Sequence, residues 1–143
     1  KILQETGLNP KYLRLEITES VFMESYEFIR SELEDLYDIG VHMALDDFGK
    51  GYSSLAYLKF LPIHTLKIDK SFIDDIVQEN KERLLTDQII SIGEKLGLHV
   101  VAEGVERDEQ LEYLVHHQCD RYQGFIFSRP VPEEEAVSLL QRN

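Results

Sequence analysis

The chain has 143 residues, which is the size of a single domain, and 43% of them are hydrophobic while 29% are charged. This mixture is typical of a globular protein and excludes collagen-like, low-complexity and disordered chains. No apolar run approaches the roughly 18 residues that a membrane-spanning helix requires. Acidic residues outnumber basic residues by 27 to 15, and the net charge of −12 disfavours binding to duplex nucleic acid or to an anionic membrane surface.

Runs of strand-like residues alternate with helical patterns along the chain. In chain order the pattern predicts a strand over 12–18, a helix over 24–39, a strand over 42–47, a glycine-rich loop over 48–54, a short helix ending at Leu61, a strand over 65–69, a helix over 82–96, a strand over 99–103, a helix over 108–118, a strand over 122–127 and a helix over 133–141. This alternation predicts βαβ units around a parallel sheet, which is an α/β fold. The opening segment, 1–10, resembles the end of a helix followed by a loop, so we expect the chain to be a fragment.

A single cysteine, Cys119, indicates the redox setting. A lone cysteine forms no internal disulfide, so we expect a reducing, cytoplasmic environment. We expect Cys119 itself to be a small buried hydrophobic residue and not a nucleophile.

Most of the expected strands carry aliphatic residues on one face and a polar residue on the other, usually near the carboxyl end. These polar residues are Glu16, Asp46, Lys67, Asp69 and Glu103, and in the fifth strand Gln123 shares a face with two phenylalanines. Strands of a helix-covered parallel sheet are buried on both faces, so a carboxylate there is costly unless it is paired or bound to metal. The carboxyl ends of barrel strands converge on one mouth, and we therefore favour a functional site over structural ion pairs.

Asp46 and Asp47 are adjacent at the end of the second strand, where the regular pleat can break. Oxygen ligands select hard cations such as Mg²⁺, Mn²⁺ or Ca²⁺, and adjacent aspartates can serve two neighbouring ions, as a phosphodiester displacement uses. An aspartate-rich turn is the alternative interpretation of this pair taken alone. Lys67 either holds or deprotonates a water molecule, or neutralises Glu16, and the spacing is compatible with both roles.

Five segments resemble the EAL domain, the bacterial phosphodiesterase that opens the second messenger cyclic di-GMP. They occur in the family's order and are LRLEITES (13–20), ALDDFGKGYSS (44–54), LKIDKSFI (66–73), VVAEGVE (100–106) and CDRYQGFIFSRP (119–130). The resemblance covers essentially the whole chain. It implies a TIM-like barrel in which one strand is reversed.

The resemblance also implies roles for individual residues and two Mg²⁺ or Mn²⁺ ions in each site. Metal ligation is implied for Glu16, Asp46, Asp47 and Glu103, and a catalytic role for Lys67, Glu16 and Asp46, with Lys67 contacting the catalytic water. Supporting roles fall on Glu19, Asp69 and Gln123. A regulatory loop that couples dimerisation to activity would comprise Phe48, Gly49, Lys50, Gly51, Tyr52, Ser53 and Ser54. Lys50 stands where many members carry a small Thr or Ser.

The Glu-Ala-Leu signature strand that names the family does not occur in this sequence. A whole barrel of this type needs about 250 residues, so we expect residues 1–143 to form one partial EAL domain, the C-terminal five βα units of an incomplete barrel, with no second domain. An open barrel leaves two sheet edges unpaired, and we expect a homodimer or another cover for them. The resemblance further implies GGDEF or sensor domains upstream in the parent protein.

The leading hypothesis for function is hydrolysis of cyclic di-GMP to linear pGpG by two-metal activation of water, with the fragment alone inactive. The alternative is a catalytically silent EAL domain that acts as a cyclic di-GMP receptor or protein-interaction module. An enolase-like proton abstraction also uses carboxylates on successive strands, but the adjacent Asp46 and Asp47 argue against it.

Overall fold

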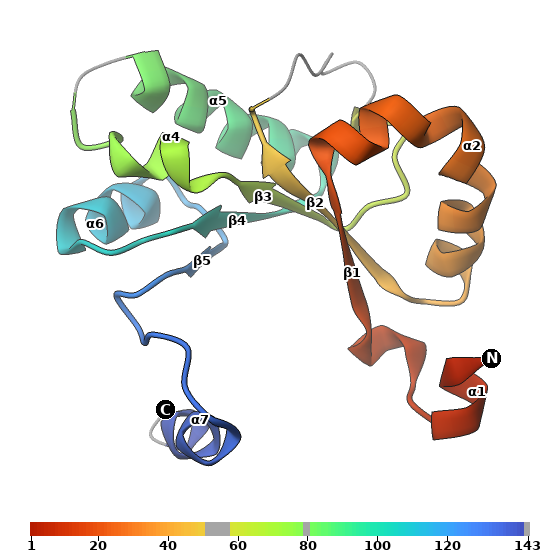
Figure 1. Ribbon diagram of the computed structural model, residues 1–143. Coiled ribbons are helices and arrows are strands. Elements are labelled where there is room, and N and C mark those ends of the chain that lie inside the picture. The colour runs from red at the N-terminus through yellow and green to blue at the C-terminus, as the bar shows by residue number, and fades with distance from the viewer. Residues whose placement is uncertain (51–57, 79–80, 142–143) are drawn as a thin grey trace.

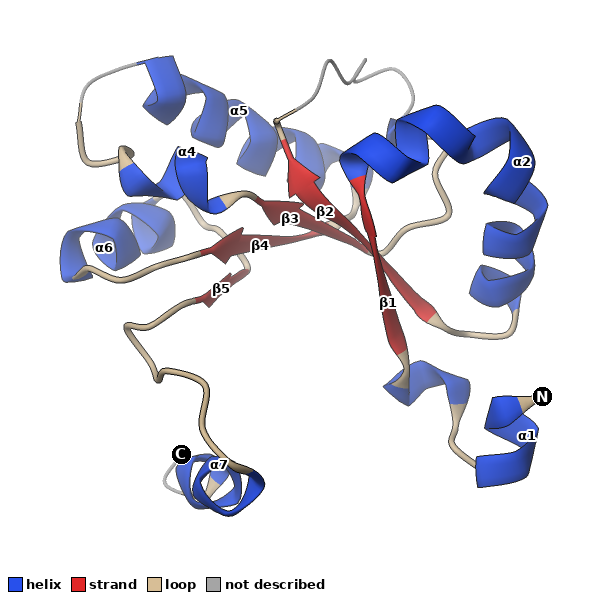
Figure 2. Cartoon of the chain, in the orientation of Figure 1, coloured by secondary structure: helices blue, strands red, loops and turns tan. Residues whose placement is uncertain are grey.

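The computed structural model describes residues 1–50, 58–78 and 81–141, which build a five-stranded parallel sheet (Figure 1; Figure 2). Neighbouring strands follow one another in chain order: β1 (Arg14–Thr18), β2 (His42–Phe48), β3 (Thr65–Ile68), β4 (His99–Glu103) and β5 (Arg121–Gln123). The helical elements are α1 (Ile2–Thr6), η1 (Pro10–Tyr12), α2 (Glu19–Asp38), α4 (Lys70–Asp74), α5 (Lys81–Leu96), α6 (Asp108–His116) and α7 (Glu133–Leu140). The expected α/β class with parallel βαβ units is confirmed.

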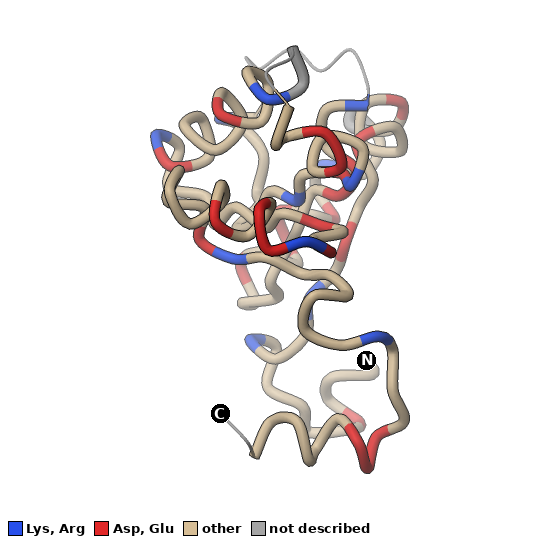
Figure 3. The backbone as a smooth tube through the Cα atoms, turned by 90° about the vertical axis from the view of Figure 1, so that its left-hand side faces the viewer, with Lys and Arg blue, Asp and Glu red and all other residues tan. Residues whose placement is uncertain are grey.

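The larger helices gather on one side of the sheet. Figure 1 shows α2, α4 and α5 over this face, and the aliphatic face of the strands is buried there with Met43, Leu45, Leu66, Ile68 and Val100 in the core. The two terminal helices, α1 and α7, lie away from this layer on the other side, as the side view in Figure 3 also shows. None of the residues of α7 is buried. Within the described residues, β1 and β5 are the edge strands.

The first third of the chain departs from the expected boundaries. Pro10 opens a 3-10 turn that Asn9 caps by accepting the Lys11 N–H, so β1 begins at Arg14 and not at residue 12. Helix α2 begins at Glu19, directly after the strand, and not at residue 24. Its first turns belong to the helix because Phe22 is buried in the same core as the later turns.

The expected strand over 122–127 is wrong beyond Gln123. After that residue the chain turns against the loop that follows β4, where the Val105 carbonyl accepts the Ile126 N–H at 3.0 Å. Gly124 packs so closely on the Val105 backbone that a Cβ there would collide with it. Tyr122 stacks on Phe127 with ring centroids 5.3 Å apart, a contact that opposite faces of one strand would not permit.

Several smaller expectations have a definite outcome. Cys119 is buried, as expected. The short helix α4 was not expected, and it begins where Asp69 accepts the Ser71 N–H. Most of the short helix expected before Pro62 lies outside the described residues, and the chain is helical at Leu58.

In the part of the chain that the structure describes, no helix has both the length and the apolar character needed to cross a membrane.

Candidate active site

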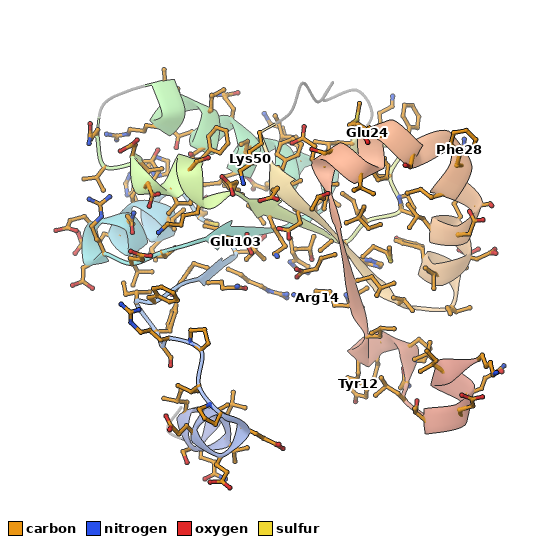
Figure 4. All side chains as sticks on the ribbon, viewed as in Figure 1. Tyr12, Arg14, Glu24, Phe28, Lys50 and Glu103 are labelled. Carbon is orange, nitrogen blue, oxygen red and sulfur yellow. The ribbon has the colours of Figure 1, made fainter. Side chains whose placement is uncertain are left out.

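Charged side chains from four neighbouring strands meet around Lys67, on the face of the sheet opposite the aliphatic core. The Lys67 Nζ lies 2.7 Å from Glu16 Oε2 on β1, 3.1 Å from Asp46 Oδ1 on β2 and 2.8 Å from Glu103 Oε1 on β4. Figure 4 labels Glu103, at the end of β4. These four residues, the Lys67 cluster, are brought together because their strands are parallel and their carboxyl ends share one edge of the sheet.

The Lys67 cluster holds more negative than positive charge. Only 7% of the Lys67 side chain is exposed, whereas Glu16 is 44% exposed. Burial acts to lower the pKa of Lys67, but hydrogen bonds to its three carboxylate partners raise that pKa above the ordinary value overall. Burial also raises the pKa of Glu103, with repulsion from Asp46 and Glu16 adding to the effect and Lys67 opposing it. The two pKa values therefore rise for different reasons: the carboxylate partners raise that of Lys67, and burial is the main cause at Glu103.

Asp46 and Asp47 lie where β2 loses its regular pairing. The register between β2 and β3 shifts between Leu45 and Phe48, which marks a bulge, and Asp47 has a φ of 56°. A bulge re-aims side chains at the rim of a sheet. Here it sends the two aspartates apart, because Asp46 joins Lys67 while Asp47 pairs with Lys50 at 2.9 Å.

Lys50 forms a second centre together with Asp47 and Asp69. Its Nζ lies 2.8 Å from Asp69 Oδ2 in addition to the contact with Asp47. Hydrogen bonds to Asp69 and Asp47 raise the pKa of Lys50. Burial acts to raise the pKa of Asp69, but hydrogen bonds from Lys50 and Ser71 hold it well below its usual range. We call Asp47, Lys50 and Asp69 the Lys50 cluster.

Glu19 connects the start of α2 with the loop after β2. It is almost fully buried, and its Oε2 accepts the Gly49 N–H at 2.8 Å. Gly49 has a φ of 105°, and a Cβ there would lie 2.6 Å from the Phe72 ring. The loop thus leaves β2 along a path that glycine permits and that Glu19 holds.

The remaining predicted site residues, Gln123 and the loop residues 51–54, belong to neither cluster. Gln123 ends β5 opposite Glu103 in the register, and it is exposed. The regulatory-loop candidates Gly51, Tyr52, Ser53 and Ser54 lie outside the described residues. Sequence reasoning missed the contacts of Lys50, although its position three residues after Asp47 was a usable signal for an ion pair.

The donor chemistry of the two clusters fits a hard divalent cation. Carboxylate oxygens are preferred ligands of Mg²⁺ and Mn²⁺, and the Lys67 cluster lacks the positive charge to balance its carboxylates. In the observed arrangement of the described residues, no group of three or more Asp, Glu, His or Cys side chains is placed to hold a metal ion. The ammonium groups of Lys67 and Lys50 lie between the carboxylates instead.

Comparison with known proteins agrees with this geometry. The family model of the EAL domain matches residues 1–130. The chain belongs to the EAL domain family. It is 45% identical over 130 residues to the cyclic di-GMP phosphodiesterase NbdA of Pseudomonas aeruginosa, covering 91% of this chain and 17% of NbdA.

The chain is also similar to two proteins with solved structures. The bifunctional diguanylate cyclase/cyclic di-GMP phosphodiesterase MucR of P. aeruginosa is 42% identical over 132 residues, covering 92% of this chain and 19% of MucR. The structure of the MucR phosphodiesterase in complex with c-di-GMP matches 94% of this chain and 54% of that chain, with a TM-score of 0.89 and 42% identity. A manganese/cy-diGMP complex of Klebsiella pneumoniae BlrP1 matches 90% of this chain and 33% of that chain, with a TM-score of 0.82 and 34% identity. The chain thus spans about half of the solved MucR phosphodiesterase chain and less than a fifth of NbdA and of full-length MucR.

Proposed function

We propose that this chain is the C-terminal part of an EAL phosphodiesterase domain that hydrolyses cyclic di-GMP to linear pGpG. The observation that carries the proposal is the convergence of Glu16, Asp46 and Glu103 on Lys67 at the carboxyl edge of the sheet. Support comes from NbdA and MucR, which are named as cyclic di-GMP phosphodiesterases and match nearly the whole chain.

Four of the five acidic residues in the two clusters are the proposed metal ligands, and Asp69 keeps a supporting role. Two divalent ions, Mg²⁺ or Mn²⁺, would be held by Glu16, Asp46, Asp47 and Glu103. The ions would lower the pKa of bound water and stabilise the negative charge that develops on the phosphorane oxygens. Without cations, this carboxylate-rich edge would repel the negatively charged phosphodiester. Bound metal ions would supply the positive charge that allows the phosphodiester to bind there. The manganese complex of BlrP1 supports this choice of metal class.

Lys67 is suited to orient water and not to deprotonate it. Its raised pKa keeps the ammonium charged at neutral pH, and it is already a hydrogen-bond donor to three carboxylates. A charged ammonium has no lone pair to accept a proton. All three N–H donors of the ammonium are used by carboxylates, so of the two roles that the sequence left open the geometry supports pairing with Glu16 and its neighbours. A protonated Lys67 would orient water only after a bound metal ion takes over one of these carboxylates.

The remainder of the barrel is proposed to come from upstream sequence. The chain covers 54% of the MucR phosphodiesterase chain, so we infer that turnover needs residues beyond these 143. The unpaired edges of β1 and β5 favour assembly, either with upstream strands or as a homodimer. Attachment to a GGDEF domain is supported by the bifunctional name of MucR. The buried, unbridged Cys119 is compatible with a cytoplasmic location.

The test is hydrolysis of cyclic di-GMP by the complete domain, which means this chain preceded by its natural upstream sequence. We expect pGpG to form with Mg²⁺ or Mn²⁺, and Lys67→Ala to lower the rate by roughly a hundredfold or more, as loss of a positioned electrostatic group does. Lys95→Ala, which removes an exposed lysine from α5, is the matched control and should retain full activity.

A folded, metal-loaded domain that forms no pGpG would contradict the proposal. Equilibrium binding of cyclic di-GMP to the same sample would then support the alternative of a catalytically silent receptor. Sedimentation of the 143-residue chain and of the complete domain tests the assembly separately. A monomeric complete domain would contradict the homodimer and leave the enzyme assignment standing.

A further inference from the structure

Lys50 joins two strand ends through its ammonium group. The Nζ lies 2.9 Å from Asp47 Oδ1 near the end of β2 and 2.8 Å from Asp69 Oδ2 directly after β3. Only 10% of the Asp69 side chain is exposed, while half of Lys50 faces solvent. Figure 4 labels Lys50 beside the end of β2. Two carboxylates at the carboxyl edge of the sheet thus already share a cation that belongs to the chain.

The backbone around Lys50 is held at several points. The Asp47 N–H donates to Asp46 Oδ1 at 3.0 Å, and the Gly49 N–H donates to buried Glu19 at 2.8 Å. Asp47 keeps a positive φ of 56°, which is uncommon for a residue other than glycine. These anchors fix the direction in which the loop leaves β2, and Lys50 is the next residue along it.

The carboxylates of the Lys50 cluster are fixed as well. Asp69 uses its other oxygen, Oδ1, to accept the Ser71 N–H at 2.9 Å at the start of α4. Its Oδ2 is therefore presented to Lys50 in one orientation. Asp47 is drawn toward the same ammonium and away from its neighbour Asp46, which contacts Lys67. The Lys50 pairs separate two adjacent aspartates that would both be needed for a pair of metal ions.

We propose that Lys50 is an internal competitor for the second divalent ion of the site. Its single ammonium is shared by Asp47 and Asp69, so a second ion held by Asp47 competes with Lys50 for that carboxylate. The ion pairs of Lys50 include no residue of the Lys67 cluster, and the two clusters are linked only through the Asp47 N–H, which donates to Asp46 Oδ1, among the described contacts. The proposal rests on the proposed function, because it concerns the same metal site. If Lys50 competes in this way, the second ion binds more weakly than the first, and replacing Lys50 changes the affinity for the second ion only.

The expected size of the effect follows from the exposure of the pairs. Partly exposed ion pairs contribute modestly each, and displacing Lys50 breaks two of them. Removal of the ammonium should therefore tighten the second ion by roughly tenfold. The first ion should keep its affinity within about twofold, because the ion pairs of Lys50 are made with Asp47 and Asp69 and with no residue of the Lys67 cluster.

The experiment counts Mn²⁺ ions bound to the complete domain, by calorimetry and by the electron paramagnetic resonance signal of free Mn²⁺. Wild type is compared with Lys50→Thr, which removes the charge, and Lys50→Arg, which keeps it. Lys70→Thr is the matched control, since Lys70 is similarly exposed but pairs with Asp74 and Glu106 instead. We expect a tighter second ion only in Lys50→Thr.

Thermal unfolding gives a second readout that does not depend on turnover. In EDTA, Lys50→Thr should unfold at a slightly lower temperature than wild type, because Asp47 and Asp69 lose their shared cation. With saturating Mn²⁺ its gain in unfolding temperature should exceed that of wild type. Competition predicts that the deficit seen in EDTA disappears in saturating Mn²⁺, because Lys50 is then displaced in wild type as well, whereas a purely structural role for Lys50 would give the same deficit in both conditions.

Equal second-ion affinities in wild type and Lys50→Thr would overturn the competition and leave the phosphodiesterase proposal intact. Tightening in Lys50→Arg as large as in Lys50→Thr would also overturn it, since the charge would then not be the cause. Absence of Mn²⁺ binding in every variant would overturn the metal site itself, and with it both proposals.

Discussion

The two ends of the same sheet are built from opposite chemistry. At the carboxyl end, Lys67 lies within 3.1 Å of three carboxylates. At the amino end, the rings of His42 and His64 stack with centroids 4.6 Å apart, and Tyr37 stacks on His64 at 4.5 Å. A cavity of about 340 Å³ lies at this end, and apolar side chains such as Leu61 form much of its wall.

The two ends of the sheet differ in whether they hold buried charge, which is costly to remove from water. Burial lowers the pKa of His64, and the neighbouring His42 and His99 lower it further, so the His64 ring is neutral at physiological pH. The carboxyl end instead holds buried charges in a network, although paired buried ions rarely stabilise more than an apolar substitute would. Charge is retained at the carboxyl end, where barrel enzymes keep their active sites.

The largest expected effect comes from removing the shared cation of the carboxyl end. Lys67→Met should lower the free energy of unfolding by about 2–4 kcal/mol in EDTA, less than for a fully buried pair because Glu16 is half exposed. Urea unfolding of the complete domain measures this. Divalent metal should restore more of the loss in the variant than it adds to wild type. An unchanged free energy in EDTA would contradict the cost assigned to the three carboxylates.

Alanine at Gly124 and at Gly97, which lie toward opposite ends of the sheet, should destabilise the fold for different reasons: a collision at Gly124 and an unfavourable backbone angle at Gly97. Gly124→Ala, beyond the carboxyl end of β5, should cost about 2 kcal/mol of unfolding free energy, because its Cβ meets the Val105 backbone. Gly97→Ala, before β4, meets no atom within 4 Å but requires a φ of 69°, and it should cost about 1 kcal/mol. Denaturant midpoints rank the two. A larger loss in Gly97→Ala would refute the close approach at Gly124.

Glu19 allows a smaller test of the carboxyl end. Glu19→Ala should cost about 1–2 kcal/mol because the Gly49 N–H loses its buried acceptor. Glu19→Gln keeps a side-chain oxygen and should lose less than half as much. Thermal unfolding of both variants provides the comparison, and equal losses would show that the carboxylate charge, and not the acceptor, holds the loop.

The smallest effect is expected at the amino end, from pH. Since the pKa of His64 is lowered in the folded state, the unfolded chain binds more protons, and stability falls as the pH drops below about 6.5. Protonation at Nδ1 would also remove the acceptor of the Met43 N–H. His64→Asn should flatten the decline between pH 7 and 5, whereas His116→Asn, at an exposed position, should not. Identical pH slopes in wild type and His64→Asn would contradict the neutral ring.

Much of this contrast was present in the sequence. Alternation along the strands placed Glu16, Asp46, Lys67 and Glu103 on one face, and their convergence needs only a parallel sheet in chain order. The divergence of Asp46 and Asp47 was not predictable, because it depends on a bulge and on Lys50 reaching another strand end.

Local sequence also failed where tertiary contacts decide the path of the chain. The segment 122–127 has the alternation of a strand, but Gly124 lets the chain turn onto Val105. The predicted start of α2 at residue 24 was too late, because burial of Phe22 in the core extends the helix back to the end of the strand. Such contacts join residues that periodicity treats separately.

The most direct test of the metal site is the anomalous scattering of manganese in crystals of the complete domain soaked with Mn²⁺ and cyclic di-GMP. We predict manganese peaks within bonding distance of Glu16, Asp46 and Glu103, at the carboxyl end of the sheet. Peaks only at the histidines of the amino end, or none beside these three carboxylates in a fully loaded crystal, would contradict the assignment.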